Sequence, residues 1–237
     1  MNREYHKWFS QRLNRDMEML VFGHGGMPVL VFPTSMGSFY EYEDRGMVDI
    51  LRWPIERGSM MLFCVDSIDT ESWYCKWAHP SGRVYRHIQY DDYLYSEVVP
   101  LMRARTGHQK VATTGASFGG YHCTNFALKH PDAVHTCVAM SGAFDIHPFL
   151  DGYYDENCYF NCPVDFLPQM TDSWHLNEFR NMRWVFGAGE HDICLNETRR
   201  ISGIFHAKGI PHWFDFWGFG AVHDWPLWQQ MARKYFE

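Results

Sequence analysis

Two continuous apolar runs constrain the fold more than any other feature of the sequence. They read MPVLVFP over residues 27–33 and MMLFCVD over residues 60–66. A strand exposed on one face alternates apolar and polar residues, whereas a short unbroken apolar run is typical of a strand buried on both faces. Such strands occur in parallel sheets whose two faces are covered by helices. The sequence therefore predicts an α/β protein.

The rest of the chain alternates between predicted strands and predicted helices. Further strands are predicted over 110–115, 133–142, 182–189 and 211–218, and helices over 41–53, 89–105, 118–131, 195–208 and 224–235. This alternation predicts a mainly parallel central sheet flanked by helices. Two opening strands, 4–10 and 17–22, are joined by a polar turn and would add an antiparallel edge. Pro54 and Pro100 are expected to disturb the helices that contain or precede them.

The chain of 237 residues contains no repeat, low-complexity stretch or Gly/Ser linker. We therefore expect a single domain over residues 1–237. Residues 143–181 have an irregular pattern rich in aromatic residues, Asp, Asn and Pro, and we predict that they form at most a small lid insertion. Five aromatic side chains are available to line it: Phe149, Tyr153, Tyr154, Phe160 and Trp174.

Charge and cysteine usage exclude several classes of partner. The net charge is −7 with both signs interspersed, so we expect binding neither to nucleic acid nor to an anionic membrane. No apolar run is long enough to cross a bilayer. The seven cysteines are scattered without a CxxC pair, which indicates reduced thiols. With a charged N-terminal segment that lacks an apolar core, we expect a cytoplasmic location; the oligomeric state stays open, a homo-oligomer included.

A glycine-rich pentapeptide stands between the predicted strand 110–115 and the predicted helix 118–131. Residues 115–119 read GASFG and fit the pattern G-x-S-x-G. In this pattern the serine occupies a strained strand-to-helix turn that projects its hydroxyl above the sheet, and the glycines allow close approach of neighbouring backbone. Ser117 is therefore the candidate nucleophile. The alternative is a glycine-rich turn without catalytic meaning.

A serine hydroxyl needs a general base, usually a histidine oriented by a carboxylate. The chain order that accompanies this kind of serine turn is Ser, then Asp or Glu, then His. GEHDIC begins at the last residue of the predicted strand 182–189 and continues past its end. GFGAVHDW does the same at the end of the predicted strand 211–218. We predict His223 as the base and Asp192 as the carboxylate, with Glu190 as the fallback.

Other interpretations of these residues are open at this point. Asp192 could cap the helix that follows it. The dipeptides His191-Asp192 and His223-Asp224 could suggest metal ligands, but no spacing such as HExxH supports a metal site. Four histidines that lie within predicted helices or strands are interpreted as structural: His122, His135, His206 and His212.

Acyl transfer passes through an oxyanion that needs two fixed N–H donors. The residue after the nucleophile, Phe118, is expected to supply one. The loop PTSMG, residues 33–37, follows a predicted buried strand and is expected to supply the other. We favour the backbone N–H of Ser35, with Met36 next. The alternative is that PTSMG is an ordinary turn.

Taken together, the motifs resemble the α/β-hydrolase esterase family that includes esterase D, feruloyl esterases and the antigen 85 mycolyltransferases. The resemblance covers nearly the whole chain and is carried by VFPTSMGSFYEYEDRG, SWYCKW, TTGASFGGYH, MSGAFDIHPFLDGYY, NCPVDFLP, GEHDIC and HDWPLW. It implies an α/β-hydrolase fold with Ser117 as nucleophile, Asp192 as acid and His223 as base. It also implies an oxyanion hole from the PTSM loop and Phe118. The chain departs from many α/β-hydrolases in having Pro33-Thr34 where they carry His-Gly.

These observations predict a serine carboxylester hydrolase that works through a Ser-His-Asp triad and an acyl-enzyme intermediate, on a small-molecule ester and without a cofactor. Three alternatives remain. An acyltransferase would use the same triad with an alcohol in place of water. A non-catalytic binding protein could be built on the hydrolase fold, although all three triad positions are filled. A metal-dependent hydrolase would lose activity with a chelator.

Overall fold

The computed structural model describes residues 1–236, and its strands form one eight-stranded sheet in the order β1-β2-β4-β3-β5-β6-β7-β8. The strands are β1 Arg3–Ser10, β2 Arg15–Phe22, β3 Met27–Phe32, β4 Met60–Val65, β5 Val111–Ala116, β6 Val134–Met140, β7 Arg183–His191 and β8 Trp213–Val222. The β1–β2 and β2–β4 pairs are antiparallel, and every other pair is parallel. The predicted mainly parallel sheet with an antiparallel edge is confirmed.

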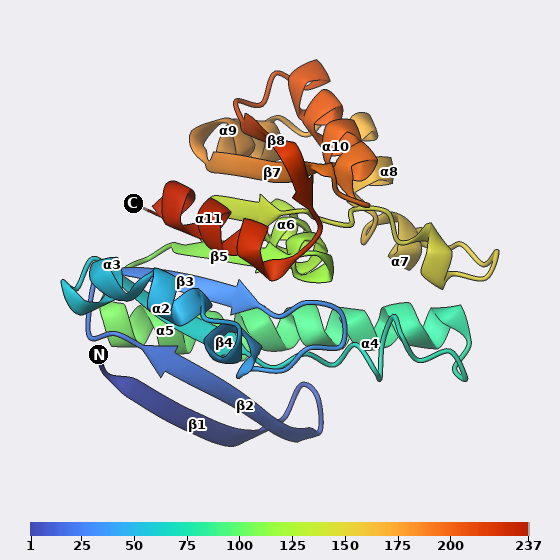
Figure 1. Ribbon diagram of the computed structural model, residues 1–237. Coiled ribbons are helices and arrows are strands. Elements are labelled where there is room, and N and C mark those ends of the chain that lie inside the picture. The colour runs from blue at the N-terminus through green and yellow to red at the C-terminus, as the bar shows by residue number, and fades with distance from the viewer. Residues whose placement is uncertain (237) are drawn as a thin grey trace.

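Helices cover both faces of the sheet (Figure 1). They are α1 Glu41–Asp44, α2 Met47–Ile50, α3 Arg52–Glu56, α4 Pro80–Tyr93, η1 Leu94–Val98, α5 Val99–Thr106, α6 Phe118–Lys129, η2 His147–Phe149, α7 Glu156–Tyr159, α8 Pro163–Gln169, α9 Ser173–Asn181, α10 Leu195–Ala207 and α11 Trp225–Phe236. Successive side chains of β3 enter different cores. Leu30 and Phe32 belong to a hydrophobic cluster that includes side chains of α4, α6 and α10, whereas Val29 and Val31 belong to a second cluster that includes side chains of α2 and α11. This is why the run 27–33 is apolar throughout.

The prediction of one continuous helix over 41–53 is wrong. The segment forms three short helices, α1 to α3, and Pro54 lies inside α3 rather than at a helix end. Gly46 separates α1 from α2 with φ of 71°, a left-handed conformation that cannot continue an α-helix.

The predicted helix 89–105 begins too late. The helical stretch starts at Pro80 and runs through α4, η1 and α5 to Thr106. His79 caps it by accepting the N–H of Ser81 on Nδ1, and Pro80 occupies the first turn, where a missing N–H costs nothing. The π-turn η1 precedes Pro100, and this wider turn gives the proline ring room that a regular α-turn lacks.

The segment 143–181, expected to be irregular, contains η2 and three short helices, α7 to α9. Two aspartates begin helices there: Asp155 accepts the N–H of Cys158, and Asp172 accepts the N–H of His175. The helices are too short for an apolar periodicity to identify them, but these caps and Pro163 at the start of α8 were readable signals.

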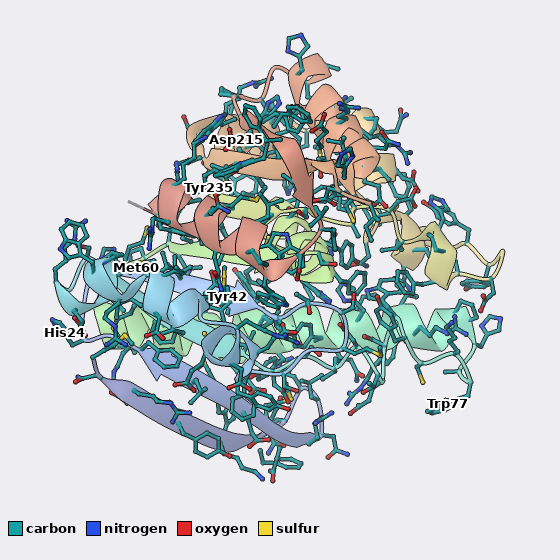
Figure 2. All side chains as sticks on the ribbon, in the orientation of Figure 1. His24, Tyr42, Met60, Trp77, Asp215 and Tyr235 are labelled. Carbon is teal, nitrogen blue, oxygen red and sulfur yellow. The ribbon has the colours of Figure 1, made fainter. Side chains whose placement is uncertain are left out.

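The C-terminal helix is tied to the edge strand that precedes it. Tyr235 of α11 donates to Oδ2 of Asp215 on β8 at 2.9 Å, and Lys234 pairs with the same carboxylate (Figure 2). The connection between β8 and α11 holds His223 and Asp224. The contacts with Asp215 join the start of β8 to the end of α11, the two elements on either side of this connection.

Two expectations from composition can be compared with the described residues. All seven cysteines are free, in agreement with the predicted reduced thiols, and all seven are buried. No helix within residues 1–236 combines the length and the apolar character that a membrane span requires.

Candidate active site

Ser117 lies between the end of β5 and the start of α6, as the G-x-S-x-G pattern predicted. Its backbone has φ of 55° and ψ of −122°, a combination rarely adopted by residues other than glycine. The N–H of Ser117 donates to the carbonyl of Met140 on β6 at 2.9 Å, and its carbonyl accepts the N–H of Ala143 at 3.2 Å. These contacts join the turn to β6 and to the segment that follows it, and so hold the strained conformation.

The glycines around Ser117 are required by close backbone packing. A Cβ atom at Gly115 would lie 2.3 Å from the carbonyl oxygen of Gly119, and one at Gly119 would lie 2.5 Å from that of Pro33. A Cβ at Gly120 would lie 2.7 Å from the Cα of Gly142. The contact with Pro33 also shows that the loop after β3 abuts the first turn of α6.

His223 follows the last residue of β8. Its Nε2 lies 2.9 Å from Oγ of Ser117, and its Nδ1 lies 2.7 Å from Oδ1 of Asp192. A carboxylate only accepts hydrogen bonds, so the ring proton facing Asp192 belongs on Nδ1, which leaves Nε2 free to accept from the serine hydroxyl. This is the tautomer that a general base needs.

The approach to His223 differs from the sequence prediction. The predicted strand ends at Gly218, whereas β8 continues and pairs with β7 as far as Val222. Phe219 and Gly220 have positive φ values of 57° and 74°, and the pairing register shifts opposite them, between Gly189 and His191. The glycine-rich stretch therefore forms a bulge near the end of β8, shortly before His223.

Asp192 follows β7, and its side chain is fully buried. Oδ1 accepts the backbone N–H of Cys194 at 2.8 Å in addition to the contact with His223. Burial alone would raise the pKa of Asp192, but the hydrogen bonds from His223, Ser141 and the Cys194 N–H outweigh it and lower the pKa below its ordinary value. The group is thus a charged carboxylate at neutral pH.

The alternatives considered for this carboxylate can now be compared. The residue that caps α10 is Cys194, and Asp192 does not occupy that position. Glu190 is exposed and accepts the N–H of Gly220 at 3.0 Å; within the described chain no hydrogen bond joins it to His223. Position and contacts therefore favour Asp192.

Two groups of three side chains have potential ligand atoms within 4.8 Å of one another, a spacing that could suit a metal ion: Asp192, Cys194 and His223, and Asp145, His147 and Cys162. Their atoms already have protein partners. Asp192 and His223 bind each other, and Asp145 pairs with both His147 and Arg200. Burial also raises the pKa of the Cys194 thiol to about 12, which disfavours the thiolate that metals bind.

Two residues that sequence reasoning missed support the His223–Asp192 pair. Trp228 of α11 lies edge-on to the His223 ring, with centroids 5.0 Å apart and planes at 88°. Its Nε1 donates to Oγ of Ser141 at 2.8 Å, and Ser141 in turn hydrogen-bonds Asp192. Ser141 follows β6 and Trp228 lies in α11, so only the fold brings them to the site.

Ser35 carries the unpaired N–H of the loop 33–37. Pro33 has no N–H. The other donors have acceptors: Thr34 donates to Oε2 of Glu41 (2.8 Å), Met36 to Oδ2 of Asp69 (2.9 Å) and Gly37 to the carbonyl of Thr34 (2.9 Å). Among the described residues the N–H of Ser35 has no acceptor. Phe118 opens α6, so its N–H has no acceptor within the helix. The arrangement removes Met36, the second choice from sequence, as a free donor.

Aromatic rings surround these two donors. Tyr74 donates to Oγ of Ser35 at 2.8 Å and lies edge-on to Phe118, with centroids 5.4 Å apart. Phe149 of η2 contacts both rings, at 4.9 Å from Tyr74 and 5.2 Å from Phe118. The segment predicted as a lid therefore reaches the candidate oxyanion donors through Phe149.

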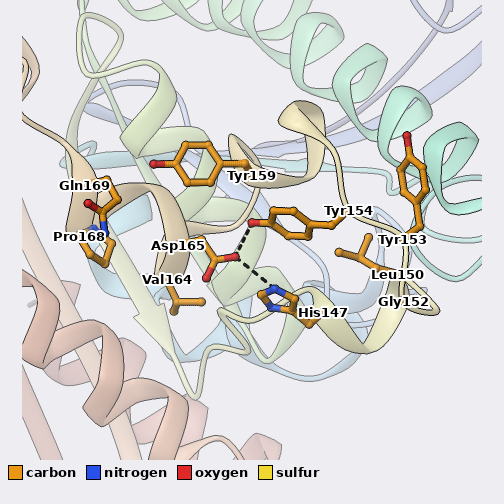
Figure 3. Close-up of a pocket in the computed structure, with 10 residues that line it drawn as sticks. All are labelled: His147, Leu150, Gly152, Tyr153, Tyr154, Tyr159, Val164, Asp165, Pro168 and Gln169. Atoms are coloured by element: carbon orange, nitrogen blue, oxygen red, sulfur yellow. Dashed lines mark hydrogen bonds and ion pairs between the residues drawn. The ribbon is translucent and has the colours of Figure 1, made fainter.

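A cavity of about 660 Å³ is lined by residues between 147 and 169, within the segment predicted as a lid (Figure 3). Tyr153 and Tyr154 line it, as does Asp165, which accepts a hydrogen bond from Tyr154 at 2.5 Å and lies 3.3 Å from Nε2 of His147. Phe160 and Trp174, also offered as lid-lining residues from sequence, are each 50% exposed and do not line it.

The comparisons with known proteins agree on the fold. A sequence model described as the alpha/beta hydrolase fold matches residues 71–157. No curated protein matches the chain. Among solved structures, a ferulic acid esterase superimposes with a TM-score of 0.79 at 18% identity, covering 98% of this chain and 95% of that one.

Two further structures superimpose over similar lengths. An S-formylglutathione hydrolase from Agrobacterium tumefaciens has a TM-score of 0.77 at 16% identity, with 99% of this chain and 92% of that one covered. MPT51 from Mycobacterium tuberculosis has a TM-score of 0.71 at 16% identity, with 99% and 96% covered. The chain therefore has the α/β-hydrolase fold that the sequence resemblance implied, and its structural neighbours include esterases and hydrolases.

Proposed function

We propose that this protein is a serine hydrolase that cleaves carboxylic esters of small molecules through an acyl-enzyme intermediate. The observation that carries the proposal is the unbroken line of contacts from Asp192 through His223 to Ser117, with separations of 2.7 Å and 2.9 Å. The three residues follow β7, β8 and β5, at the carboxyl ends of parallel strands, where α/β proteins bind ligands. The neighbours named as a ferulic acid esterase and an S-formylglutathione hydrolase support an ester or thioester as substrate.

In the first half-reaction, Oγ of Ser117 attacks the acyl carbonyl carbon while its proton passes to Nε2 of His223. The C–O bond to the alcohol then breaks, and the imidazolium returns that proton to the leaving alcohol. Asp192 keeps the imidazole in the required tautomer and stabilises the imidazolium, since its buried carboxylate is charged.

The oxyanion formed by this attack needs donors that do not have to reorganise. The N–H groups of Phe118 and Ser35 fit this role, because neither is engaged elsewhere and the close contact between Gly119 and Pro33 brings their segments together. In the second half-reaction water attacks the acyl-enzyme with His223 again as base, and the acid leaves. These steps use only side chains, backbone N–H groups and water.

A fluorophosphonate probe tests the proposal, because it phosphonylates a serine only when nucleophile and base act together. We expect intact mass to show one adduct per chain, mapped by peptide analysis to Ser117. The Ser117→Ala variant should take up no probe and lose at least about 10⁴-fold in turnover of a p-nitrophenyl ester, with an unchanged circular dichroism spectrum. Full activity in the variant, or an adduct on another residue, would contradict the assignment.

A further inference from the structure

A second His–Asp pair lies next to the candidate oxyanion donors. Asp69 and His122 are 1% and 3% exposed, and Oδ1 of Asp69 lies 2.9 Å from Nε2 of His122. The other oxygen, Oδ2, accepts the N–H of Met36 at 2.9 Å. We propose that Asp69 and His122 are positioning residues that hold the loop 33–37 so that the N–H of Ser35 faces the oxyanion. The inference rests on the proposed function.

Met36 lies in a turn closed by the bond from the Gly37 N–H to the Thr34 carbonyl, and the hydroxyl of Ser67 donates to the Gly37 carbonyl at 2.7 Å. The φ of Met36 is 56°, which is unfavourable for a residue other than glycine. The Met36 side chain is 54% exposed, so packing does not hold it. The bond from its backbone N–H to Asp69 is the contact that fixes the Met36 N–H itself.

Hydrogen bonds hold the residues on both sides of Ser35, whose N–H is free. Thr34 is held on one side, where its N–H and hydroxyl both donate to Glu41, at 2.8 Å and 2.7 Å. Met36 is held on the other side by Asp69. The peptide N–H between them, that of Ser35, is thereby left unpaired and restricted in orientation.

The pair also ties this loop to the helix that supplies the other donor. Phe118 and His122 are four residues apart on α6, on the same face, and their rings meet edge-on at 4.9 Å and 80°. His122 also stacks on Phe32, the last residue of β3, at 5.9 Å and 11°. One helix therefore sets the positions of both donors, and displacement of one relative to the other weakens transition-state stabilisation.

A purely structural role for the pair makes a different prediction. Asp69 also organises its own turn, because its carbonyl accepts the N–H groups of Ser72 and Tyr74. If the pair only stabilised this turn, its loss would lower the melting temperature and leave kcat nearly unchanged. If it positions the donor, kcat falls while KM changes little, since the oxyanion exists only after attack.

Three variants and one matched control separate these roles. His122→Phe keeps the ring but removes the donor to Asp69, whereas His122→Gln keeps an N–H donor. Asp69→Asn keeps the shape of the side chain but leaves one acceptor oxygen, whereas both carboxylate oxygens of Asp69 have hydrogen-bond partners. The control is His130→Phe, because His130 directly follows the same helix and its Nε2 is also 2.9 Å from a carboxylate, that of Asp91.

We expect Asp69→Asn and His122→Phe to lower kcat about ten- to a hundredfold, less than the 10²–10³ lost when a donor is removed outright, with KM within about twofold. Affinity for a trifluoromethyl ketone, which forms an oxyanion on Ser117, should fall in parallel with kcat. His122→Gln should recover part of the loss, and His130→Phe should leave kcat unchanged. Unchanged kcat in Asp69→Asn and His122→Phe would overturn the inference.

Hydrogen exchange of the peptide spanning 34–37 provides a readout that needs no activity. In the wild type the Met36 amide should exchange slowly, and in His122→Phe it should exchange faster, with no such change in His130→Phe. A wild type that neither labels with fluorophosphonate nor turns over any ester overturns the proposed function, and with it the role in donor positioning. Suppose instead that the wild type is labelled and active. If kcat and the exchange of the 34–37 peptide then stay unchanged in Asp69→Asn and His122→Phe, the positioning role alone is overturned.

Discussion

His223–Asp192 and His122–Asp69 are chemically the same kind of pair in two regions of one site. In each a ring nitrogen lies close to a carboxylate oxygen, at 2.7 Å and 2.9 Å respectively, and both carboxylates are buried. They differ in what the remaining atoms contact. The free nitrogen of His223 faces the hydroxyl of Ser117, whereas the free oxygen of Asp69 accepts a backbone N–H.

This difference shows that the third contact determines the role of such a pair. A ring that meets a hydroxyl can move a proton, so the proposed chemistry belongs to His223. The His122 ring is buried against Phe32 and Phe118, and its Nε2 faces the carboxylate of Asp69 and not a hydroxyl. Its carboxylate partner can only hold backbone in place.

Of the substitutions in the two His–Asp pairs, Asp192→Asn is expected to have the largest effect on kcat. In Asp192→Asn the amide can donate to Nδ1 of His223 and so favour the tautomer with the proton on Nε2, which cannot accept from Ser117. We expect kcat to fall by about 10⁴, measured on a p-nitrophenyl ester. Glu190→Gln, which changes an exposed carboxylate two residues away, is the control and should stay near wild-type activity. A fall of less than tenfold in Asp192→Asn would remove Asp192 from the proposed mechanism.

A third pair, His130–Asp91, should affect stability and not catalysis. Burial alone would raise the pKa of Asp91, but Lys129 and His130 outweigh it and lower the pKa to about 2. Because this lies below the unfolded value of about 3.9, the stabilisation is present above roughly pH 5 and is lost as pH falls toward 2. The free energy of unfolding of Asp91→Asn should therefore be about 2 kcal/mol lower than that of the wild type at pH 7. This difference should shrink as the pH falls toward 2.

Urea unfolding at pH 7, 5 and 3 measures this difference. The kcat of Asp91→Asn at pH 7 should equal that of the wild type, because no atom of the pair contacts the proposed site residues. A stability difference that stays constant from pH 7 to 3 would contradict the lowered pKa.

Removing a contact that supports the His223–Asp192 pair should lower kcat by a smaller amount. Trp228→Phe keeps a ring beside His223 but removes the hydrogen bond to Ser141. One such bond contributes about 0.5–1.5 kcal/mol, so we expect kcat to fall roughly three- to tenfold with KM unchanged. Steady-state kinetics on the same ester give both values. An unchanged kcat would mean that Ser141 holds Asp192 without help from Trp228.

The smallest effect is expected at Tyr74, on the oxyanion side. Tyr74→Phe removes the bond to the Ser35 side chain but leaves both backbone anchors of the loop. We expect kcat to fall less than about threefold, near the lower end of what one neutral hydrogen bond contributes. A loss as large as that of Asp69→Asn would show that the Ser35 hydroxyl contact, and not the Met36 anchor, positions the donor.

Much of the candidate site could be predicted from the sequence because it follows local rules. Ser117 has a strand before it, a helix after it and glycines at the required spacing. Asp192 and His223 each follow a predicted strand in the expected chain order. The start of α4 was missed although His79 and Pro80 form a recognisable helix start, because the apolar spacing farther along the helix was the stronger pattern.

Residues whose roles depend on long-range contacts could not be predicted. Asp69 follows β4 and His122 lies within α6, and nothing in the sequence around either residue indicates that they meet. His122 was interpreted as structural because it falls inside a helix. The choice of Ser35 over Met36 likewise depended on Asp69, which lies 33 residues farther along the chain and takes up the Met36 N–H.

The sequence by itself determined the α/β class, the strands buried on both faces and the residue types of the candidate nucleophile, base and acid, because apolar periodicity and turn chemistry act over a few neighbouring residues. Only the tertiary structure decided which N–H of the loop 33–37 is free, which His–Asp pair meets a hydroxyl and which residues hold each pair in place. Those outcomes depend on hydrogen bonds between residues tens of positions apart, whose geometry exists only once the sheet has brought their strands together.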